Sequence, residues 1–295
     1  MNENKKKLNL WRIIYPILAF FGIQLIATFF ISVFFATKAV VATGSTDTTV
    51  ILNYITNAIY DNYDLINAII YAVSIPLMLL FMHMDKNRLM REGEYVTYEK
   101  PAFGYFIAAA LLGVFAAITV NNLLDISGLT TQESETYDEI AETIYSGSIY
   151  INLIVYAVLG PVVEELVFRG LLYKRLRESM GVVISVVFSA LMFGVYHGNL
   201  AQGIYAGILG VVFALCMEKF KSVLAPILAH VLANVFSILF SSLGGADFLN
   251  QSTTYIIIYI AGGAILTLVF LYIVCEKVNA KVLIPAAGKP IETEE

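Results

Sequence analysis

The chain has 295 residues, of which 59% are hydrophobic and only 14% are charged, and its formal net charge is −5. Soluble domains usually contain about 25% charged residues, so this composition excludes a water-soluble fold. No basic surface suggests nucleic-acid binding. The two cysteines stand alone in apolar stretches, which argues against a disulfide framework or a thiolate metal site. We therefore expect an all-α integral membrane protein.

Long apolar runs predict about eight membrane-spanning helices, since roughly 20 apolar residues cross the hydrocarbon core as a helix. The first run follows three lysines, but it is long enough to span, and we interpret it as a retained helix rather than a cleaved signal peptide. Together the spans form one membrane domain over residues 1–283, and residues 284–295 are predicted to be a disordered tail. The predicted spans are residues 13–36, 63–83, 102–120, 149–172, 181–197, 201–217, 223–243 and 254–275.

The positions of the basic residues predict the orientation, because cytoplasmic loops carry an excess of lysine and arginine. Sixteen of the 18 basic residues fall in the termini or in loops on the same side of the membrane as the termini. The loop at 121–148 has six acidic residues and no basic one. Both termini are therefore expected inside. Residues 44–62 carry apolar side chains at helical spacing and are expected to form an amphipathic helix on the outer surface.

Ionisable and amide side chains inside predicted spans stand out, because they are unfavourable at bilayer depth and usually mark a function. The fourth span contains Glu-Glu-x-x-x-Arg, the fifth ends with Phe-x-x-x-His, and the seventh contains His-x-x-x-Asn. The polar side chains of these three patterns are Glu164, Glu165, Arg169, His197, His230 and Asn234, and Phe193 opens the second pattern.

Helix geometry predicts that these groups meet. With a turn near residue 180, Glu164 lies level with His197 in an antiparallel hairpin, and the seventh span places His230 and Asn234 at a similar depth. Glu165 and Arg169 are four residues apart with the acid first, the favourable order for an ion pair within a helix. Glu164 points about 100° away from Glu165, so it is the carboxylate free to face a cavity.

This set of side chains suits peptide-bond hydrolysis. A carboxylate and an imidazole can activate water, which predicts that role for Glu164 and His197. A second imidazole and a carboxamide can stabilise an oxyanion, which predicts that role for His230 and Asn234. A divalent metal such as zinc, bound by Glu164, His197 and His230, is an alternative that the sequence leaves open.

The three patterns in this order, on successive hydrophobic helices, resemble the CAAX protease and bacteriocin-processing family, also called Abi or CPBP proteins. The resemblance covers about residues 149–243, the expected catalytic core. It implies a multi-spanning endopeptidase, like the enzymes that remove a C-terminal tripeptide from prenylated proteins, with a membrane-associated or lipidated protein or peptide as substrate. It further implies site residues Glu164, His197, His230 and Asn234, and in bacteria a role in bacteriocin maturation or self-immunity. Whether the chemistry is glutamate-type or metal-dependent is left open by the resemblance.

Two other classes of function remain open at this point. A proton-coupled transporter could use Glu164 and His197 as a relay, although the chain shows no repeat of the kind many transporters have. A catalytically silent scaffold or regulator of another membrane enzyme is the other alternative. In each case we expect a multi-pass protein of a bacterial plasma membrane.

Overall fold

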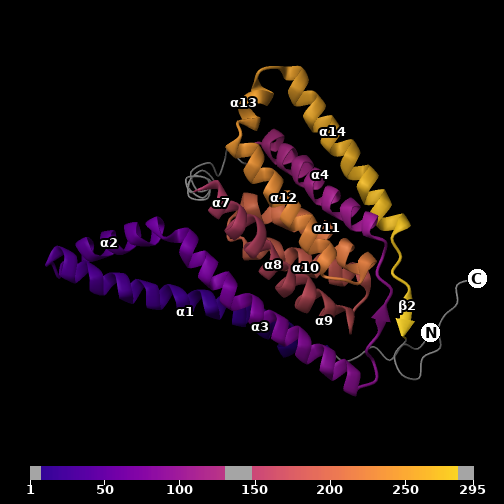
Figure 1. Ribbon diagram of the computed structural model, residues 1–295, viewed down its shortest axis with the longest axis horizontal. Coiled ribbons are helices and arrows are strands. Elements are labelled where there is room, and N and C mark those ends of the chain that lie inside the picture. The colour runs from indigo at the N-terminus through magenta and orange to yellow at the C-terminus, as the bar shows by residue number, and fades with distance from the viewer. Residues whose placement is uncertain (1–7, 130–147, 285–295) are drawn as a thin grey trace, which may run out of the picture.

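The computed structural model describes residues 8–129 and 148–284 of the chain. Within these ranges the protein is a helical bundle with a protruding arm and one short pair of strands (Figure 1). Seven described helical segments are long and apolar enough to cross a membrane. They are Leu10–Thr43, Tyr63–Arg91, Phe103–Ser127, Ile149–Arg177, Leu200–Phe220, Leu224–Ser242 and Thr253–Lys277. The predicted all-α multi-pass bundle is confirmed.

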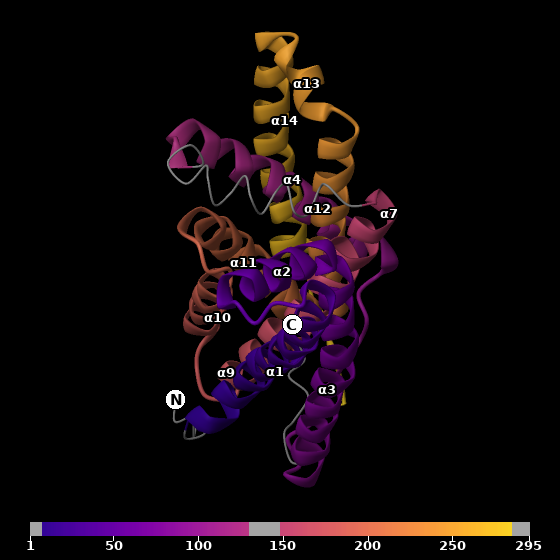
Figure 2. The same cartoon turned by 90° about the vertical axis from the view of Figure 1, so that its left-hand side faces the viewer.

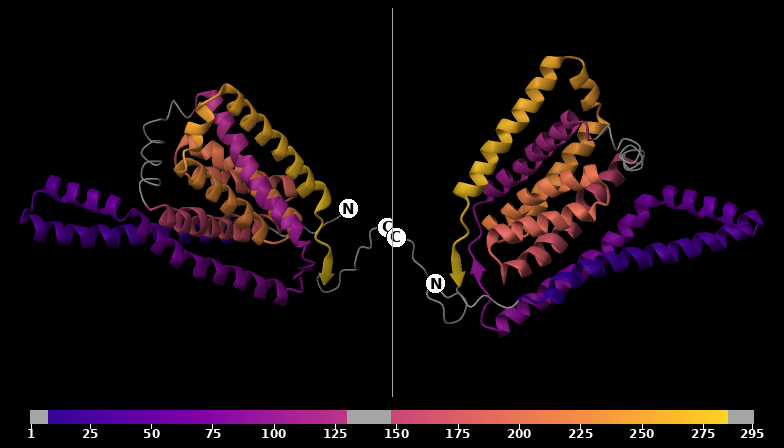
Figure 3. Two further views of the ribbon diagram at one scale, coloured as in Figure 1. Left: turned by 45° about the horizontal axis from the view of Figure 1, so that its top comes forward. Right: turned by 180° about the vertical axis from the view of Figure 1, so that it is seen from behind.

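The arm consists of α1 (Leu10–Thr43), α2 (Thr48–Asp61) and α3 (Tyr63–Arg91). The second half of α1 and the whole of α2 extend away from the other helices (Figures 1 and 3). Asp47 begins α2 by accepting hydrogen bonds from the backbone N–H groups of Thr49 and Val50, at 2.8 and 3.2 Å. The helix expected between residues 44 and 62 is therefore present. Its position on a membrane surface stays a prediction.

The fourth predicted span is one continuous rod built from short segments with different hydrogen-bond patterns. It contains two π-helical stretches, and π turns inside helices frequently occur at functional sites. Both glutamates of the first pattern lie in the short α-helix between the two π stretches. In chain order the segments are α7 (Ile149–Asn152), η1 (Leu153–Leu159), α8 (Gly160–Glu165), η2 (Leu166–Tyr173) and α9 (Lys174–Arg177).

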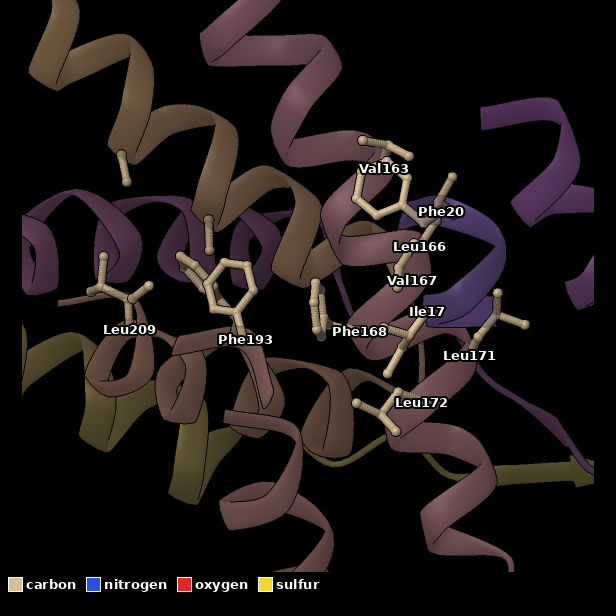
Figure 4. Close-up of a cluster of buried hydrophobic side chains, with 14 of the residues drawn as sticks. Ile17, Phe20, Val163, Leu166, Val167, Phe168, Leu171, Leu172, Phe193 and Leu209 are labelled. Atoms are coloured by element: carbon tan, nitrogen blue, oxygen red, sulfur yellow. The ribbon is translucent and has the colours of Figure 1, made fainter. Parts of the chain in front are cut away.

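This rod lies in the centre of the hydrophobic core. Every residue of η2 is buried. Phe168 of η2 meets Phe193 edge-on at a centroid distance of 5.1 Å, and Ile17 and Phe20 of α1 pack on the other apolar side chains of the rod (Figure 4). Because lipid tails are as apolar as these side chains, such contacts stabilise the bundle through close packing rather than through exclusion of water.

Helices α10 (Val182–Tyr196) and α11 (Leu200–Phe220) form an antiparallel hairpin beside the rod (Figure 2). Their backbones approach so closely that a Cβ atom on Gly194 would lie 2.6 Å from the carbonyl oxygen of Gly203. Gly198 makes the turn between them with a positive φ of 79°, a conformation that only glycine adopts freely. The predicted fifth span is thus a helix of 15 residues, shorter than the other spanning helices.

The remaining helices pack on the rod through α12 and on α11 through α12 and α4. The long helix α4 (Phe103–Ser127) lies between α12 (Leu224–Ser242) and α14 (Thr253–Tyr272), and the short α13 (Gly245–Asn250) connects the last two (Figure 1). The end of α4 corrects one expectation, since residues 121–127 continue the helix instead of beginning the acidic loop. Most of that loop, residues 130–147, lies outside the described residues.

After α14 the chain continues through η3 (Ile273–Lys277) to β2 (Val282–Ile284). This strand pairs in antiparallel fashion with β1 (Thr97–Tyr98), which precedes α4. The pairing was not foreseen, and it includes Ile284, the first residue of the predicted disordered tail. The rest of that tail lies outside the described residues. Both strands belong to the side of the bundle on which the termini were predicted to lie.

Charged side chains connect the helices on this same side. We call Arg12, Asp85, Arg88, Arg175 and Glu178 the inner charge cluster. Arg12 bonds to Asp85 and to Glu178, each at 2.9 Å, Arg88 bonds to Glu178 at 2.7 Å, and Arg175 bonds to Asp85 at 2.6 Å. The cluster joins the start of α1 and the end of α3 to the end of the central rod.

Candidate active site

The two adjacent glutamates of α8 have different surroundings. The carboxylate of Glu165 accepts a hydrogen bond from Arg169 at 3.0 Å, and both side chains are 0% exposed. Arg169 also donates to the backbone carbonyl of Gly210 on α11 at 3.0 Å. The predicted ion pair is therefore confirmed. Glu164 stands outside it, with a side chain that is 12% exposed.

His230 on α12 connects the two glutamates. Its Nδ1 lies 3.0 Å from Glu165 Oε1. An ionised carboxylate only accepts hydrogen bonds, so the ring donates through Nδ1, and this fixes its orientation. Its Nε2 then faces Glu164 Oε2 at 3.9 Å. That distance is too long for a direct hydrogen bond, and it allows a water or a substrate oxygen to bond to both groups.

Two phenylalanines enclose the buried ion pair. The guanidinium carbon of Arg169 lies 4.4 Å from the ring centre of Phe193 and 5.5 Å from that of Phe213. The Phe213 ring also stacks on His230 at 4.7 Å. A desolvated cation over an aromatic face gains about 2 kcal/mol. The aromatic rings therefore help to hold Arg169, and through it Glu165 and His230.

His197 lies just after the end of α10, where its Nδ1 is 2.9 Å from the backbone oxygen of Phe193. A carbonyl oxygen only accepts, so Nδ1 is the donor, and in the neutral ring Nε2 is left as a free acceptor. Rings of His197 and His230 both meet Phe193 edge-on, at 4.8 and 5.7 Å. No ion pair joins His197 to Glu164 in the part of the chain that the structure describes. The histidine that faces Glu164 is therefore His230, at 3.9 Å, rather than the histidine expected to lie level with it.

Asn234 is oriented by an irregularity in the central rod. In the π stretch η1, the N–H of Gly160 bonds to Val155 O, so the next carbonyl, that of Tyr156, would need the N–H of residue 161. Residue 161 is a proline and has no N–H. The Tyr156 carbonyl therefore accepts from the side-chain amide of Asn234 at 3.0 Å. The amide keeps a second N–H and its own oxygen for another partner.

Comparison with known proteins identifies this arrangement. Residues 146–236 match the family model described as type II CAAX prenyl endopeptidase Rce1-like. These residues, 91 of the 295 in the chain, are similar to that family. The matched segment contains the six polar residues of the three patterns and Phe193.

One curated relative of the chain is a Bacillus subtilis (strain 168) protein named "Putative membrane peptidase YdiL". The two are 24% identical over 165 residues, which are 54% of this chain and 64% of the relative. The matching region thus spans less than two thirds of the relative's length. No solved structure shows significant similarity to the chain.

A metal ion fits the described side chains of this site poorly. Within residues 8–129 and 148–284, no three His, Cys, Asp or Glu side chains converge as metal ligands would. Of the three ligands considered from sequence, Glu164 and His230 face each other, whereas His197 is held at Phe193.

Several residues of this candidate site were not predicted from the sequence. Gly210 had a signal: Gly203, Gly207 and Gly210 lie on one side of α11, a pattern typical of close helix packing in membranes. A Cβ atom at Gly210 would lie 3.1 Å from Arg169 Nη2, so the glycine makes room for the arginine. Phe213 had no comparable signal, since the chain contains 19 phenylalanines.

Proposed function

We propose that this protein is an intramembrane endopeptidase of the glutamate type, which hydrolyses a peptide bond with water activated by Glu164 and His197. The observation that supports it most is that the two adjacent glutamates, Glu164 and Glu165, have different partners. Arg169 neutralises Glu165, whereas Glu164 remains partly accessible and faces His230 across 3.9 Å. Two adjacent carboxylates in such different surroundings suit one positioning role and one chemical role.

In the proposed reaction Glu164 acts as the general base. Its carboxylate takes a proton from a water molecule while the water oxygen bonds to the carbonyl carbon of the scissile peptide. His197 accepts a hydrogen bond from the same water through its free Nε2 and so orients it. Glu164 then passes the proton to the leaving amine as the carbon–nitrogen bond breaks.

His230 and Asn234 are proposed to stabilise the oxyanion that forms on the carbonyl oxygen. Asn234 offers the amide N–H that Tyr156 leaves unused, and His230 donates through Nε2 when its ring carries both protons. Both groups are fixed before substrate arrives, by Tyr156 and by Glu165. Donors held in advance stabilise developing charge most effectively.

The substrate class is part of the proposal. Similarity to type II CAAX prenyl endopeptidases supports a substrate with a lipidated C-terminal segment, and the Bacillus relative supports a bacterial plasma membrane as the location. Processing of a bacteriocin precursor, or self-immunity to one, is a further proposal. It predicts that cells lacking the gene lose maturation of such a precursor or become sensitive to its product.

The test is cleavage of a fluorogenic C-terminal peptide library, with and without a prenylated cysteine, by the purified full chain. We expect Glu164→Gln to lower kcat by about a hundredfold or more, because general base catalysis contributes roughly 10² to 10⁴. The variant should unfold at about the temperature of the wild type, since Glu164 lies 3.9 Å from His230 and makes no direct hydrogen bond to it. A chelator should leave the rate unchanged.

Three outcomes would contradict the proposal. Full activity in Glu164→Gln would exclude the general base, and loss of activity with chelator would favour the metal alternative. Cleavage of nothing by the folded wild type, together with pH-dependent ion flux in vesicles, would favour the transporter alternative.

A further inference from the structure

Gln24 is the one charged or amide side chain within the predicted first span, residues 13–36. Such a group is unfavourable inside a bilayer unless it has a partner. Its amide donates to the phenol oxygen of Tyr196 on α10 at 3.2 Å. This bond connects the arm to the residue directly before His197.

The ring of Tyr196 is held within the site. It lies 5.4 Å from the His197 ring and 5.6 Å from both Phe168 and Phe20. Its phenol, like that of Tyr71 on α3, lies within the electrostatic reach of Glu164. Tyr71 packs beside Gly160, one turn before the two glutamates, with its ring 3.5 Å from where a Cβ atom would be.

Gln24 and Tyr196 each retain a hydrogen-bonding group that has no partner among the described residues. The phenol of Tyr196 accepts from Gln24, so its own proton is available, and the Gln24 amide retains an oxygen acceptor. Among the described residues no side chain or backbone group takes up either one. Both residues are partly exposed, unlike Glu165 and Arg169. A donor and an acceptor side by side match the C=O and N–H of a peptide backbone.

We propose that Tyr196 and Gln24 form a substrate-binding pair, in which the Tyr196 phenol donates to a backbone carbonyl of the peptide and the Gln24 oxygen accepts a backbone N–H. The inference rests on the proposed function and extends it to the arm. The substrate peptide then lies between α1 and the end of α10, next to Glu164.

The test uses the peptide that the full chain cleaves best. Tyr196→Phe retains the ring and its packing and removes only the hydroxyl. Loss of one neutral hydrogen bond made in both ground and transition state should raise KM about threefold to tenfold and leave kcat within about twofold. Gln24→Leu should raise KM in the same range. In the double variant, the loss of binding free energy should not exceed the sum of the losses in the two single variants. Because the two residues contact each other, the combined loss should be smaller than that sum.

Tyr259→Phe is the matched control, because Tyr259 on α14 stacks on Phe240 and has no contact with the site. It should change neither constant. Binding can also be measured directly, by fluorescence anisotropy of the same peptide with the inactive Glu164→Gln variant. Adding Tyr196→Phe to that variant should raise Kd by the factor by which it raises KM.

An unchanged KM in both Tyr196→Phe and Gln24→Leu, with normal unfolding temperatures, would overturn the inference while Glu164→Gln still reported on the proposed function. A fall in kcat alone would also overturn it, because the pair would then act through His197. If the wild type neither binds nor cleaves any peptide, the proposed function and this inference fail together.

Discussion

Two groups of ion pairs sit on the same helical rod and differ in their surroundings. In the candidate active site Glu165 and Arg169 are both 0% exposed and are covered by aromatic rings. In the inner charge cluster the side chain of Arg175 is 1% exposed, but its partner and the other members are between 16% and 23% exposed. The chemical groups are the same in both places, and access to water is what separates them.

The difference shows what each group contributes. A buried pair gains little net stability from its own attraction, because both charges lost their hydration, but removing one partner leaves the other charge uncompensated. A partly exposed pair is screened by water and contributes at most about 1 kcal/mol. The buried pair therefore fixes positions, namely those of His230 and Gly210, and the exposed cluster holds helix ends together.

The largest predicted effect is for Arg169→Met. It leaves Glu165 buried without its cation, so we expect the free energy of unfolding in detergent to fall by about 3–5 kcal/mol, with loss of peptidase activity. Denaturant unfolding followed by tryptophan fluorescence of Trp11 or by circular dichroism measures the change. Adding Glu165→Gln to Arg169→Met should recover part of the stability without recovering activity. A stability loss below about 1 kcal/mol would contradict the distinction between the two clusters.

An intermediate effect is predicted for Pro161→Ala, which changes no charge. The new N–H at residue 161 can bond to the Tyr156 carbonyl and compete with Asn234, so we expect kcat to fall about tenfold, or about 1.4 kcal/mol. Pro226→Ala is the matched control, because Pro226 lies in the first turn of α12, where an added N–H has no helical acceptor. Combined with Asn234→Ala, the proline substitution should have no additional effect. A normal rate in Pro161→Ala would show that the irregular rod does not orient the amide.

The smallest effect is predicted for Arg88→Ala in the inner charge cluster. Its side chain is 19% exposed and pairs with Glu178 and Glu92, so unfolding should become easier by about 0.2–1 kcal/mol. Raising the salt concentration to about 1 M should shrink that difference, since the screening length falls to roughly 3 Å. The effect of Arg169→Met should hardly respond to salt. Equal salt responses in the two variants would show that the clusters do not differ as described.

Seven of the eight predicted spans correspond to helices long enough to cross a membrane, because hydropathy and span length are properties of local sequence. The pair of Glu165 and Arg169 followed from their spacing alone. The histidine that faces Glu164 could not be predicted in this way. Equal distance from the turn of a hairpin determines the depth of two residues, but it does not determine how each helix is rotated about its axis. Glu164 faces His230 from a rod that contains two π-helical stretches, and π turns have no sequence signature of their own.

Contacts between distant segments were the other part that the sequence could not supply. Gln24 and Tyr196 are 172 residues apart, and neither helix indicates by its own sequence which residue is the partner. The β1–β2 pair joins segments of two and three residues, too short to carry an alternating pattern. Such contacts depend on how whole helices are placed relative to one another. The local periodicity of a sequence does not encode that placement.

The short helix α10 has a consequence for the bilayer itself. Its 15 residues extend about 22 Å, at 1.5 Å each, whereas the hydrocarbon layer is about 30 Å thick. A helix too short for the layer thins it locally or draws its polar flanking residues inward. The flanking turn is His197-Gly198-Asn199. It places polar groups at the depth predicted for Glu164 and Glu165. Local thinning of the bilayer at this point would let water reach the site. Hydrolysis consumes water, and the interior of a membrane contains almost none.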